Sequence, residues 1–174
     1  MLAASFEKYL NRYGVVPDES PVIFTNNSST FSLLKSLTDL GHKPKAYVDI
    51  RDQKNIEKET VELLEKFSIP FYPKSEVEGC EGQKEVKKVS IRTKKNQISK
   101  IKTSMLCVSG GFNPDIHLFT QSKGLLKWDK DHLTFKPDRI FQKTITLGSV
   151  SGNFSYEKLL VEVEKKLSEF KDLN

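Results

Sequence analysis

Short apolar runs alternate with helical stripes through the first two thirds of the chain. Residues 22–25 form an apolar, β-branched run between Pro21 and a polar stretch at 26–29, a pattern typical of a buried parallel strand. Comparable runs follow at 45–50, 69–72 and 105–108. The stripes between the first three runs comprise Leu33, Leu34, Leu37 and Leu40, and then Ile56, Thr60, Leu63, Leu64 and Phe67. Strand, helix, strand, helix, strand in this order predicts a βαβαβ unit with right-handed crossovers.

Elements of a different kind surround this unit. Before it, the helical spacing of Phe6, Leu10 and Tyr13 ends at Gly14. After it, three segments have the alternation of antiparallel strands. They are residues 77–80, 86–93 and 97–103. Two short strands near 126–128 and 133–135 lead to a C-terminal helix. Its apolar stripe comprises Leu160, Val163, Leu167 and Phe170.

The pattern as a whole predicts an α/β protein. We expect a Rossmann-like βαβαβ parallel sheet, an antiparallel hairpin layer formed by residues 77–103, and a C-terminal helix. The side chains expected to be almost fully buried are Ile23, Leu34, Leu37, Val48, Leu63, Leu106 and Val108.

Charge introduces an alternative function. The net charge is +5, and the basic residues cluster between Lys84 and Lys102. That cluster lies on the predicted hairpin layer and has no interleaved aromatic residues on which bases could stack. A basic nucleic-acid-binding module is therefore the third-ranked interpretation, and we expect no nucleic acid as a partner.

Composition bears on the location of the protein and on whether it has a metal or redox site. No run approaches the ~18 apolar residues that a membrane span requires, and residues 1–5 lack the basic region of a signal peptide. Cys80 and Cys107 form no metal-binding or redox motif. We expect a cytoplasmic protein with no membrane partner, no metal site and an inert thiol at Cys107.

The first candidate site is the turn after the first strand. Ligands of βαβ units bind at the carboxyl ends of the strands, where a helix N-terminus meets a pyrophosphate. Here that turn is Thr25, Asn26, Asn27 and Ser28, and it lacks the usual G-x-G-x-x-G glycines. The turn is therefore either a nucleotide site that relies on side chains or a plain structural turn.

Asp49 favours the nucleotide interpretation. It ends the second strand. Its separation along the chain from the turn after the first strand is close to the ~20 residues expected for a carboxylate that binds a ribose. Such a carboxylate favours NAD over NADP, although Arg51 weakens that discrimination. The alternative is an acidic residue that merely ends a strand.

Two glycine-containing turns complete the candidates. Gly110 and Gly111 follow the fourth strand and would let a backbone pass close to a ligand, and Gly148 precedes Ser149 before the last helix. No Ser-His-Asp or Cys-His arrangement and no pair of carboxylates stands out. We predict no catalytic residue in this chain.

Six stretches of the chain carry a resemblance to a known family: residues 9–15, 22–27, 47–49, 108–122, 126–129 and 148–155. They resemble the FAD/NAD-binding region of the alpha subunit of heterotetrameric sarcosine oxidase. The most specific of them is Ser109-Gly110-Gly111-Phe112-Asn113-Pro114, followed downstream by Trp128. The resemblance implies that the glycine-poor turn at Thr25 is the family's own variant.

The resemblance implies an architecture like that of pyridine nucleotide-disulphide oxidoreductases, with an NAD domain inserted into a discontinuous FAD-type domain. We expect an N-terminal helix and linker at 1–20, the NAD-binding domain at 21–125, and the return segment of the FAD-type domain at 126–174. The parent complex oxidatively demethylates sarcosine and uses NAD, FAD and FMN. NAD is the cofactor implied for this chain.

The resemblance also implies that parts of the parent are missing here. The family's first βαβ unit with its glycine fingerprint and its folate-binding half have no counterpart, so we expect a fragment, inactive alone and without bound flavin. Its partners would be the other subunits or the missing segments, or a second copy through the C-terminal helix. The second-ranked interpretation is a non-catalytic assembly domain that has lost the nucleotide.

Overall fold

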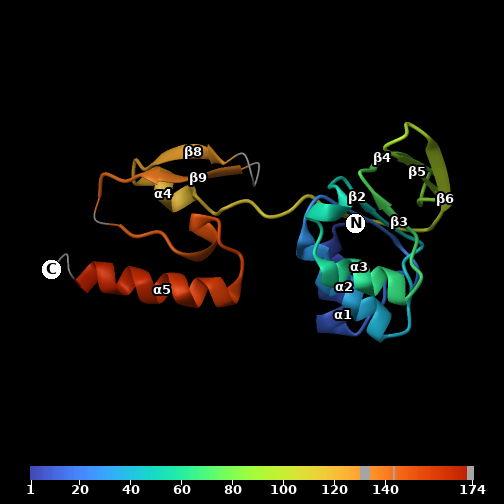
Figure 1. Ribbon diagram of the computed structural model, residues 1–174, viewed down its shortest axis with the longest axis horizontal. Coiled ribbons are helices and arrows are strands. Elements are labelled where there is room, and N and C mark those ends of the chain that lie inside the picture. Colours follow the sequence, from blue (N-terminus) through green and yellow to red (C-terminus); the bar gives the residue numbers. More distant parts are fainter. Residues whose placement is uncertain (130–133, 143, 172–174) are drawn as a thin grey trace. The chain divides into compact units, whose positions relative to one another are not determined.

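The computed structural model describes residues 1–129, 134–142 and 144–171. Its contacts divide the chain into an N-terminal unit, residues 1–111, and a C-terminal unit, residues 112–174. Both units contain helices and strands (Figure 1).

A four-stranded parallel sheet forms the centre of the N-terminal unit. In spatial order its strands are β3 (Phe71–Pro73), β2 (Ala46–Asp49), β1 (Val22–Thr25) and β7 (Leu106–Ser109). The connections on the two sides of β1 run in opposite directions along the sheet, which is the topology of an open doubly wound sheet. The predicted parallel sheet is confirmed, and the third strand begins two residues later than the apolar run.

One face of this sheet packs against helices. They are α1 (Ala3–Tyr13), α2 (Phe31–Asp39) and α3 (Lys58–Lys66), with short 3-10 turns η1 (Ser28–Thr30) and η2 (Gln53–Asn55) in the connections. Fully buried residues from both layers meet there: Phe6, Ile23, Leu33, Leu34, Leu37 and Tyr47. The apolar stripe of each helix therefore supplies one side of a dry core.

The other face is covered by a second sheet (Figure 1). Its antiparallel strands are β4 (Glu76–Glu81), β5 (Lys88–Arg92) and β6 (Ile98–Lys102). Val22, Ala46 and Val48 of the parallel sheet pack against Val89 and Ile91 of β5, all with no exposed surface. The predicted hairpin layer is thus confirmed, and it makes the N-terminal unit a three-layer structure.

Burial departs from the prediction at three positions. Leu63, Leu106 and Val108 are half-buried, whereas their neighbours Leu64 and Cys107 are buried. β7 is an edge strand, so the side chains that it directs toward the smaller antiparallel layer keep part of their surface, while Cys107 faces the helices. Leu63 lies at the rim of the helical stripe, where Leu64 occupies the core.

The chain's first residues lie along the free side of β7. The Met1 ammonium group donates to the Leu106 carbonyl at 2.7 Å, and the Met1 carbonyl accepts from the Val108 amide at 3.0 Å. Leu2 then forms a parallel bridge with Val108 before α1 begins. These bonds tie the start of the chain to the sheet.

The C-terminal unit has a hairpin and one long helix. Its elements are α4 (His117–Gln121), β8 (Leu125–Asp129), β9 (Thr134–Arg139), the 3-10 turn η3 (Gly148–Ser151) and α5 (Tyr156–Lys171). β8 and β9 pair antiparallel, as the short runs near 126–128 and 133–135 predicted, although Leu133 lies outside the described residues. None of the helices in the described ranges is both long and apolar enough to cross a bilayer.

Polar side chains lie between the elements of the C-terminal unit. The Glu162 carboxylate of α5 accepts hydrogen bonds from the Gly148 amide at 3.3 Å, from Ser151 at 2.7 Å and from Asn153 at 3.2 Å. On the hairpin, Lys136 forms an ion pair with Asp129 at 2.6 Å, and its aliphatic stem lies against Gly152. These interactions hold the η3 turn to both of its neighbours.

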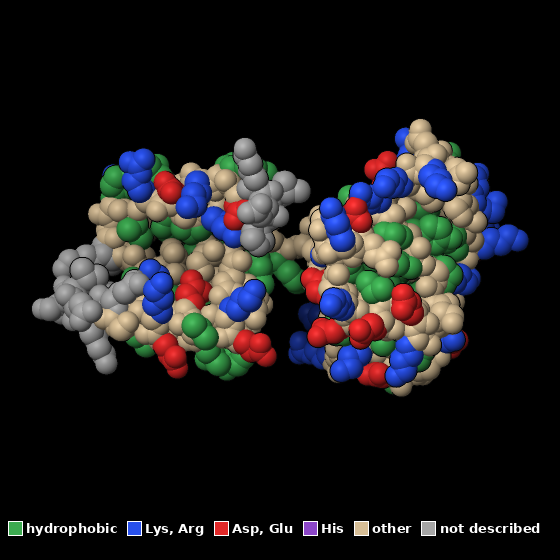
Figure 2. Space-filling model, viewed as in Figure 1, with side chains coloured by type: hydrophobic (Ala, Val, Ile, Leu, Met, Phe, Trp, Pro, Cys, Tyr) green, Lys and Arg blue, Asp and Glu red, His purple; other side chains and the backbone are tan. Residues whose placement is uncertain are grey.

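Part of the apolar surface of the same elements remains exposed, although Val163 is half-buried. Tyr156, Leu160, Val163 and Leu167 follow one another at i, i+4, i+7 and i+11, away from Glu162, and Leu160 and Leu167 are 49% and 55% exposed. The side chain of Phe170, the last member of the predicted stripe, lies outside the described residues. On the hairpin, Trp128 and Phe135 stack edge to face and are both about half exposed. Hydrophobic side chains accordingly reach the surface around α5 (Figure 2).

Candidate functional site

Three strands of the parallel sheet end at the same level. Thr25 of β1 is in register with Asp49 of β2 on one side and with Ser109 of β7 on the other. Because parallel strands share their carboxyl edge, the residues that follow each strand gather there. Most of the residues predicted from the sequence to bind a nucleotide lie at or directly after these three strand ends.

The turn after β1 is organised by the Asn27 side chain. Its carbonyl oxygen accepts from the Ser29 amide at 2.9 Å and so caps η1. Its amide group donates to the Asn26 side chain at 2.7 Å and, at 3.3 Å, to both the carbonyl and the hydroxyl of Ser109. The Ser29 and Ser109 hydroxyls are a further 2.9 Å apart. Side chains therefore bind the β1–α2 turn to the end of β7.

Gly111 lies against that turn. Its φ of +91° is in the region that favours glycine, and a β-carbon placed there would lie 3.4 Å from the Asn27 amide nitrogen. A side chain at 111 would thus be strained and would also press on Asn27. At Gly110 a β-carbon would meet nothing within 4 Å, so the backbone there is open.

The Asp49 carboxylate is buried and already engaged. Its Oδ1 accepts from the backbone amide of Arg51 at 2.8 Å and from Arg51 Nε at 3.1 Å, and its Oδ2 accepts from Arg51 Nη2 at 2.9 Å. Asp49 has no exposed surface, whereas the Arg51 side chain is 21% exposed. This bidentate pair places a guanidinium group over the carboxylate.

Arg51 connects the end of β2 with the turn after β1. Its Nη1 donates to the Ser28 hydroxyl at 3.0 Å and lies 3.9 Å from the Glu57 carboxylate, which itself accepts from Ser28. Burial lowers the pKa of Arg51, but the hydrogen bond to Asp49 and its negative charge outweigh that effect and raise the pKa above its ordinary value. The guanidinium group therefore stays charged.

Tyr47 stabilises this region from within the core. Its hydroxyl forms a 2.7 Å hydrogen bond with the hydroxyl of Thr30, and both residues are fully buried. Burial raises the pKa of Tyr47 to about 12, so it stays protonated near neutral pH. Tyr47 accordingly fixes η1 against β2.

Metal ligands and thiols are the remaining candidate groups among the described residues. They contain no group of three or more His, Cys, Asp or Glu side chains that could hold a metal ion. Burial raises the pKa of the Cys107 thiol to about 12, which makes it a poor nucleophile. Cys80 is exposed and unpaired with Cys107.

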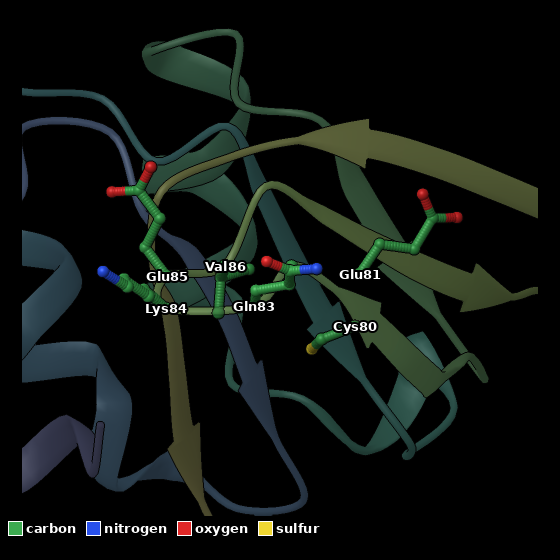
Figure 3. A pocket seen from close by; sticks show the side chains of 7 residues that line it. Cys80, Glu81, Gln83, Lys84, Glu85 and Val86 are labelled. Atoms are coloured by element: carbon green, nitrogen blue, oxygen red, sulfur yellow. The ribbon is translucent and has the colours of Figure 1, made fainter.

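A hollow of about 300 Å³ lies elsewhere, at the turn between β4 and β5 (Figure 3). It is lined only by residues 80–86 of that turn, and the carboxylates of Glu81 and Glu85 point away from each other. Gly82, at a φ of +145°, has no room for a side chain because the Glu85 carbonyl lies directly beside it. The hollow follows from this tight turn and contains none of the predicted site residues.

The basic cluster is partly neutralised by its own sheet. Lys88 and Lys100 both reach Glu81, at 3.2 and 2.7 Å, and Arg92 pairs with Glu78. Basic side chains are visible over β4–β6 in Figure 2, with acidic partners on the same strands. This pairing weakens the cluster as a surface for phosphate backbones.

The structure assembles the predicted residues and adds others. Thr25, Asn27, Ser28, Asp49 and Gly111 lie at one edge, and Asn26 and Gly110 flank it. The residues missed from the sequence are Ser109 and Glu57, which bond to Asn27 and Ser28. Ser109 directly follows an apolar run, which was the available signal, whereas nothing local distinguishes Glu57 from other acidic residues before a helix.

The sequence is similar to that of a known enzyme subunit, although no family model matches it. It is 30% identical to sarcosine oxidase subunit alpha of Corynebacterium sp. (strain U-96) over 159 residues, and 29% identical to that of Rhizobium meliloti (strain 1021) over 135 residues. These alignments cover 87% and 78% of this chain but only 16% and 13% of the relatives. The predicted resemblance is confirmed, and it is to a small part of each relative.

The fold is similar to that of thioredoxin reductases of known structure. Thioredoxin reductase of T. acidophilum superposes with a TM-score of 0.60 at 18% identity, covering 83% of this chain and 49% of the reductase. Thioredoxin reductase of Lactococcus lactis gives the same TM-score at 15% identity, with 82% and 48% covered. The predicted Rossmann-like fold is therefore confirmed.

Proposed function

We propose that this chain is the NAD-binding portion of a sarcosine-oxidase-type alpha subunit, with residues 21–125 as the nucleotide-binding domain and 126–174 as the return segment of an FAD-type domain. The observation that carries this proposal is the common edge of β1, β2 and β7, where Thr25, Asp49 and Ser109 are in register. Open doubly wound sheets bind dinucleotides at this edge. The similarity to subunit alpha supports the choice of parent enzyme.

The residues at this edge fit the adenosine end of a dinucleotide. Arg51 presents a charged guanidinium, Glu57 an exposed carboxylate and Ser28 a hydroxyl, all bonded to one another. Asp49 acts through Arg51, which it orients. The backbone at Gly110 is open, and Gly111 brings the chain close to the turn of Asn26 and Asn27. When bound, the nicotinamide would supply hydride-transfer chemistry, and these residues would only bind and orient it.

A bound flavin does not fit the C-terminal unit alone. The Gly148 amide and the Ser151 hydroxyl, which could approach a phosphate, are both occupied by the Glu162 carboxylate. We therefore propose that oxidative demethylation of sarcosine takes place only in the assembled flavoenzyme, with other subunits or segments present. Purified chain is expected to be colourless and to produce no peroxide from sarcosine.

One observation favours a second candidate, an assembly domain that has lost the nucleotide. The Asn27 side chain forms its hydrogen bonds with Asn26, Ser29 and Ser109. The Asp49 carboxylate forms its own with Arg51. An edge satisfied in this way is stable without a ligand. The two candidates differ in a single measurable property, which is whether the chain binds NAD.

Calorimetric titration of the full chain with NAD tests the proposal. Saturable binding with one site is expected, and Gly111→Ala should weaken it about tenfold because the new side chain is strained and presses on Asn27. Gly41→Ala is the matched control, since Gly41 also has a positive φ of +81° but nothing lies within 4 Å of the added carbon. Absence of binding by the unaltered chain would favour the assembly domain. Salt-dependent binding to a DNA duplex would instead support the nucleic-acid interpretation.

A further inference from the structure

We infer that Glu57, and not Asp49, is the carboxylate that accepts the adenosine ribose hydroxyls, and that the Asp49–Arg51–Glu57 cluster selects NAD against NADP. This inference rests on the proposed function. It assigns to Glu57 a part that its position in the sequence does not suggest.

Asp49 is closed to a ligand. The carboxylate has no exposed surface, and both of its oxygens accept from Arg51, at 2.8, 3.1 and 2.9 Å. A ribose hydroxyl could reach it only after the guanidinium had moved away. That movement would leave a buried carboxylate without its ion-pair partner, which is strongly unfavourable. Asp49 is therefore a positioning residue for Arg51.

Glu57 is open and lies where a ribose is expected. Its side chain is 49% exposed, accepts from the Ser28 hydroxyl and lies 3.9 Å from Arg51 Nη1. Ser28 belongs to the turn where a pyrophosphate would bind, and Arg51 follows the strand end beside which an adenosine ribose would lie. Glu57, in contact with both, lies between the two positions. Its exposed oxygens can accept from a ribose diol.

The charge of the cluster decides between the two nucleotides. Two carboxylates surround one guanidinium, so the cluster carries one net negative charge, and the neighbouring Asp52 is paired with Lys74. A 2′-phosphate would bring about two further negative charges. The only cation within the cluster, Arg51, is already bonded to Asp49 and Ser28. A neutral ribose is therefore accepted and a phosphorylated one is repelled.

Calorimetry of the full chain with NAD and with NADP tests this inference. The unaltered chain should bind NAD at least tenfold more tightly than NADP. Glu57→Gln should weaken NAD binding about tenfold or more, because a charge-assisted hydrogen bond is lost, and should narrow the gap to NADP. The control is Glu59→Gln, an exposed residue in the first turn of α3 that undergoes the same change in charge.

The outcomes separate the inference from the proposed function. If Glu57→Gln binds NAD as tightly as Glu59→Gln does, the role of Glu57 is overturned while the NAD-binding function stands. NADP binding as tight as NAD binding in the unaltered chain would overturn the selectivity. If the unaltered chain binds neither nucleotide, the proposed function fails, and this inference fails with it. Unchanged circular dichroism spectra would show that both variants are folded.

Discussion

The two units of the chain differ in the interactions that hold their elements together. In the N-terminal unit, apolar residues of the helices and of both sheets meet in two cores, and ion pairs such as Lys88–Glu81 lie at the surface. In the C-terminal unit, Glu162 and Lys136 mediate the internal contacts, while Leu160 and Trp128 lie about half exposed. The hydrophobic effect therefore stabilises the first unit from within, whereas the second unit has apolar area still to cover.

The contrast predicts different responses to the same truncation. Leu34→Ala should destabilise the N-terminal unit by about 2–5 kcal/mol, because Leu34 is fully buried and its loss leaves a cavity. Leu160→Ala, at a half-exposed position, should change stability by about 0.5 kcal/mol or less. Urea unfolding separates the two units, since the chain's one tryptophan, Trp128, reports on the C-terminal unit and far-ultraviolet circular dichroism on both. A shift of the Trp128 transition by Leu34→Ala would show that the two units unfold together.

The open stripe of α5 predicts an interaction of its own. Exposing such side chains costs about 1.5–3 kcal/mol each, so we expect α5 to dock on the N-terminal unit or to pair with a second copy of the chain. Light scattering should reveal a dimer in the second case, and hydrogen exchange should reveal protection of α5 in the first. Leu160→Glu combined with Leu167→Glu should abolish either state. A monomer with unprotected α5 before substitution would refute both.

Asp49 tests whether the strand-end edge is a binding site or only part of the fold. Asp49→Ala is expected to weaken NAD binding by about 1.5–3 kcal/mol, because Arg51 loses the charge-assisted hydrogen bonds that orient it. Calorimetry measures the change, and chemical unfolding measures the accompanying loss of stability. Unaltered NAD affinity in a destabilised variant would make Asp49 purely structural.

Glu162 makes the polar contacts of the C-terminal unit sensitive to acid. Burial raises its pKa, but hydrogen bonds from Ser151, Asn153 and Gly148 outweigh that effect and hold it below its ordinary 4.5. A depressed pKa contributes stability that is present above pH 4.5 and is lost as the pH falls through the folded-state value. Trp128 fluorescence should therefore report loosening of this unit below about pH 4.5.

A matched pair of variants isolates that effect. Glu162→Gln should remove the acid dependence and cost about 1 kcal/mol at neutral pH, through weaker hydrogen bonds. Glu164→Gln, an exposed neighbour on the same helix, should leave both the acid dependence and the stability unchanged. The same acid response in both variants would assign the loosening to other carboxylates.

Local patterns predicted the N-terminal unit well because each of its strands and helices has a recognisable apolar pattern within a few residues. The runs at β1, β2 and β7 are apolar on both faces, and the structure covers both faces, with helices and with a second sheet. What the pattern did not resolve was the extent of coverage at an edge, as at Leu106 and Val108. The exposure of side chains on an edge strand depends on how wide the neighbouring layer is. A short stretch of sequence does not contain that information.

The candidate site was predictable only in part. Strand ends locate Thr25 and Asp49, since the end of an apolar run is visible in the sequence. The ion pair of Asp49 with Arg51 and the contact of Ser28 with Glu57 depend on how the loops fold back. The latter joins residues 29 positions apart, and no periodicity relates them. Polar contacts between loops therefore had to come from the structure.

The bonds of Met1 to β7 bear on how the molecule avoids self-association through its sheet. An uncovered edge strand displays free amides and carbonyls that can recruit strands from other molecules. Here the Met1 ammonium and carbonyl groups satisfy Leu106 and Val108, and α1 turns away immediately afterwards. The amide of Val108 should consequently exchange slowly with solvent deuterium. The first two residues thus occupy hydrogen-bonding groups of the edge strand that could otherwise pair with a strand of another molecule.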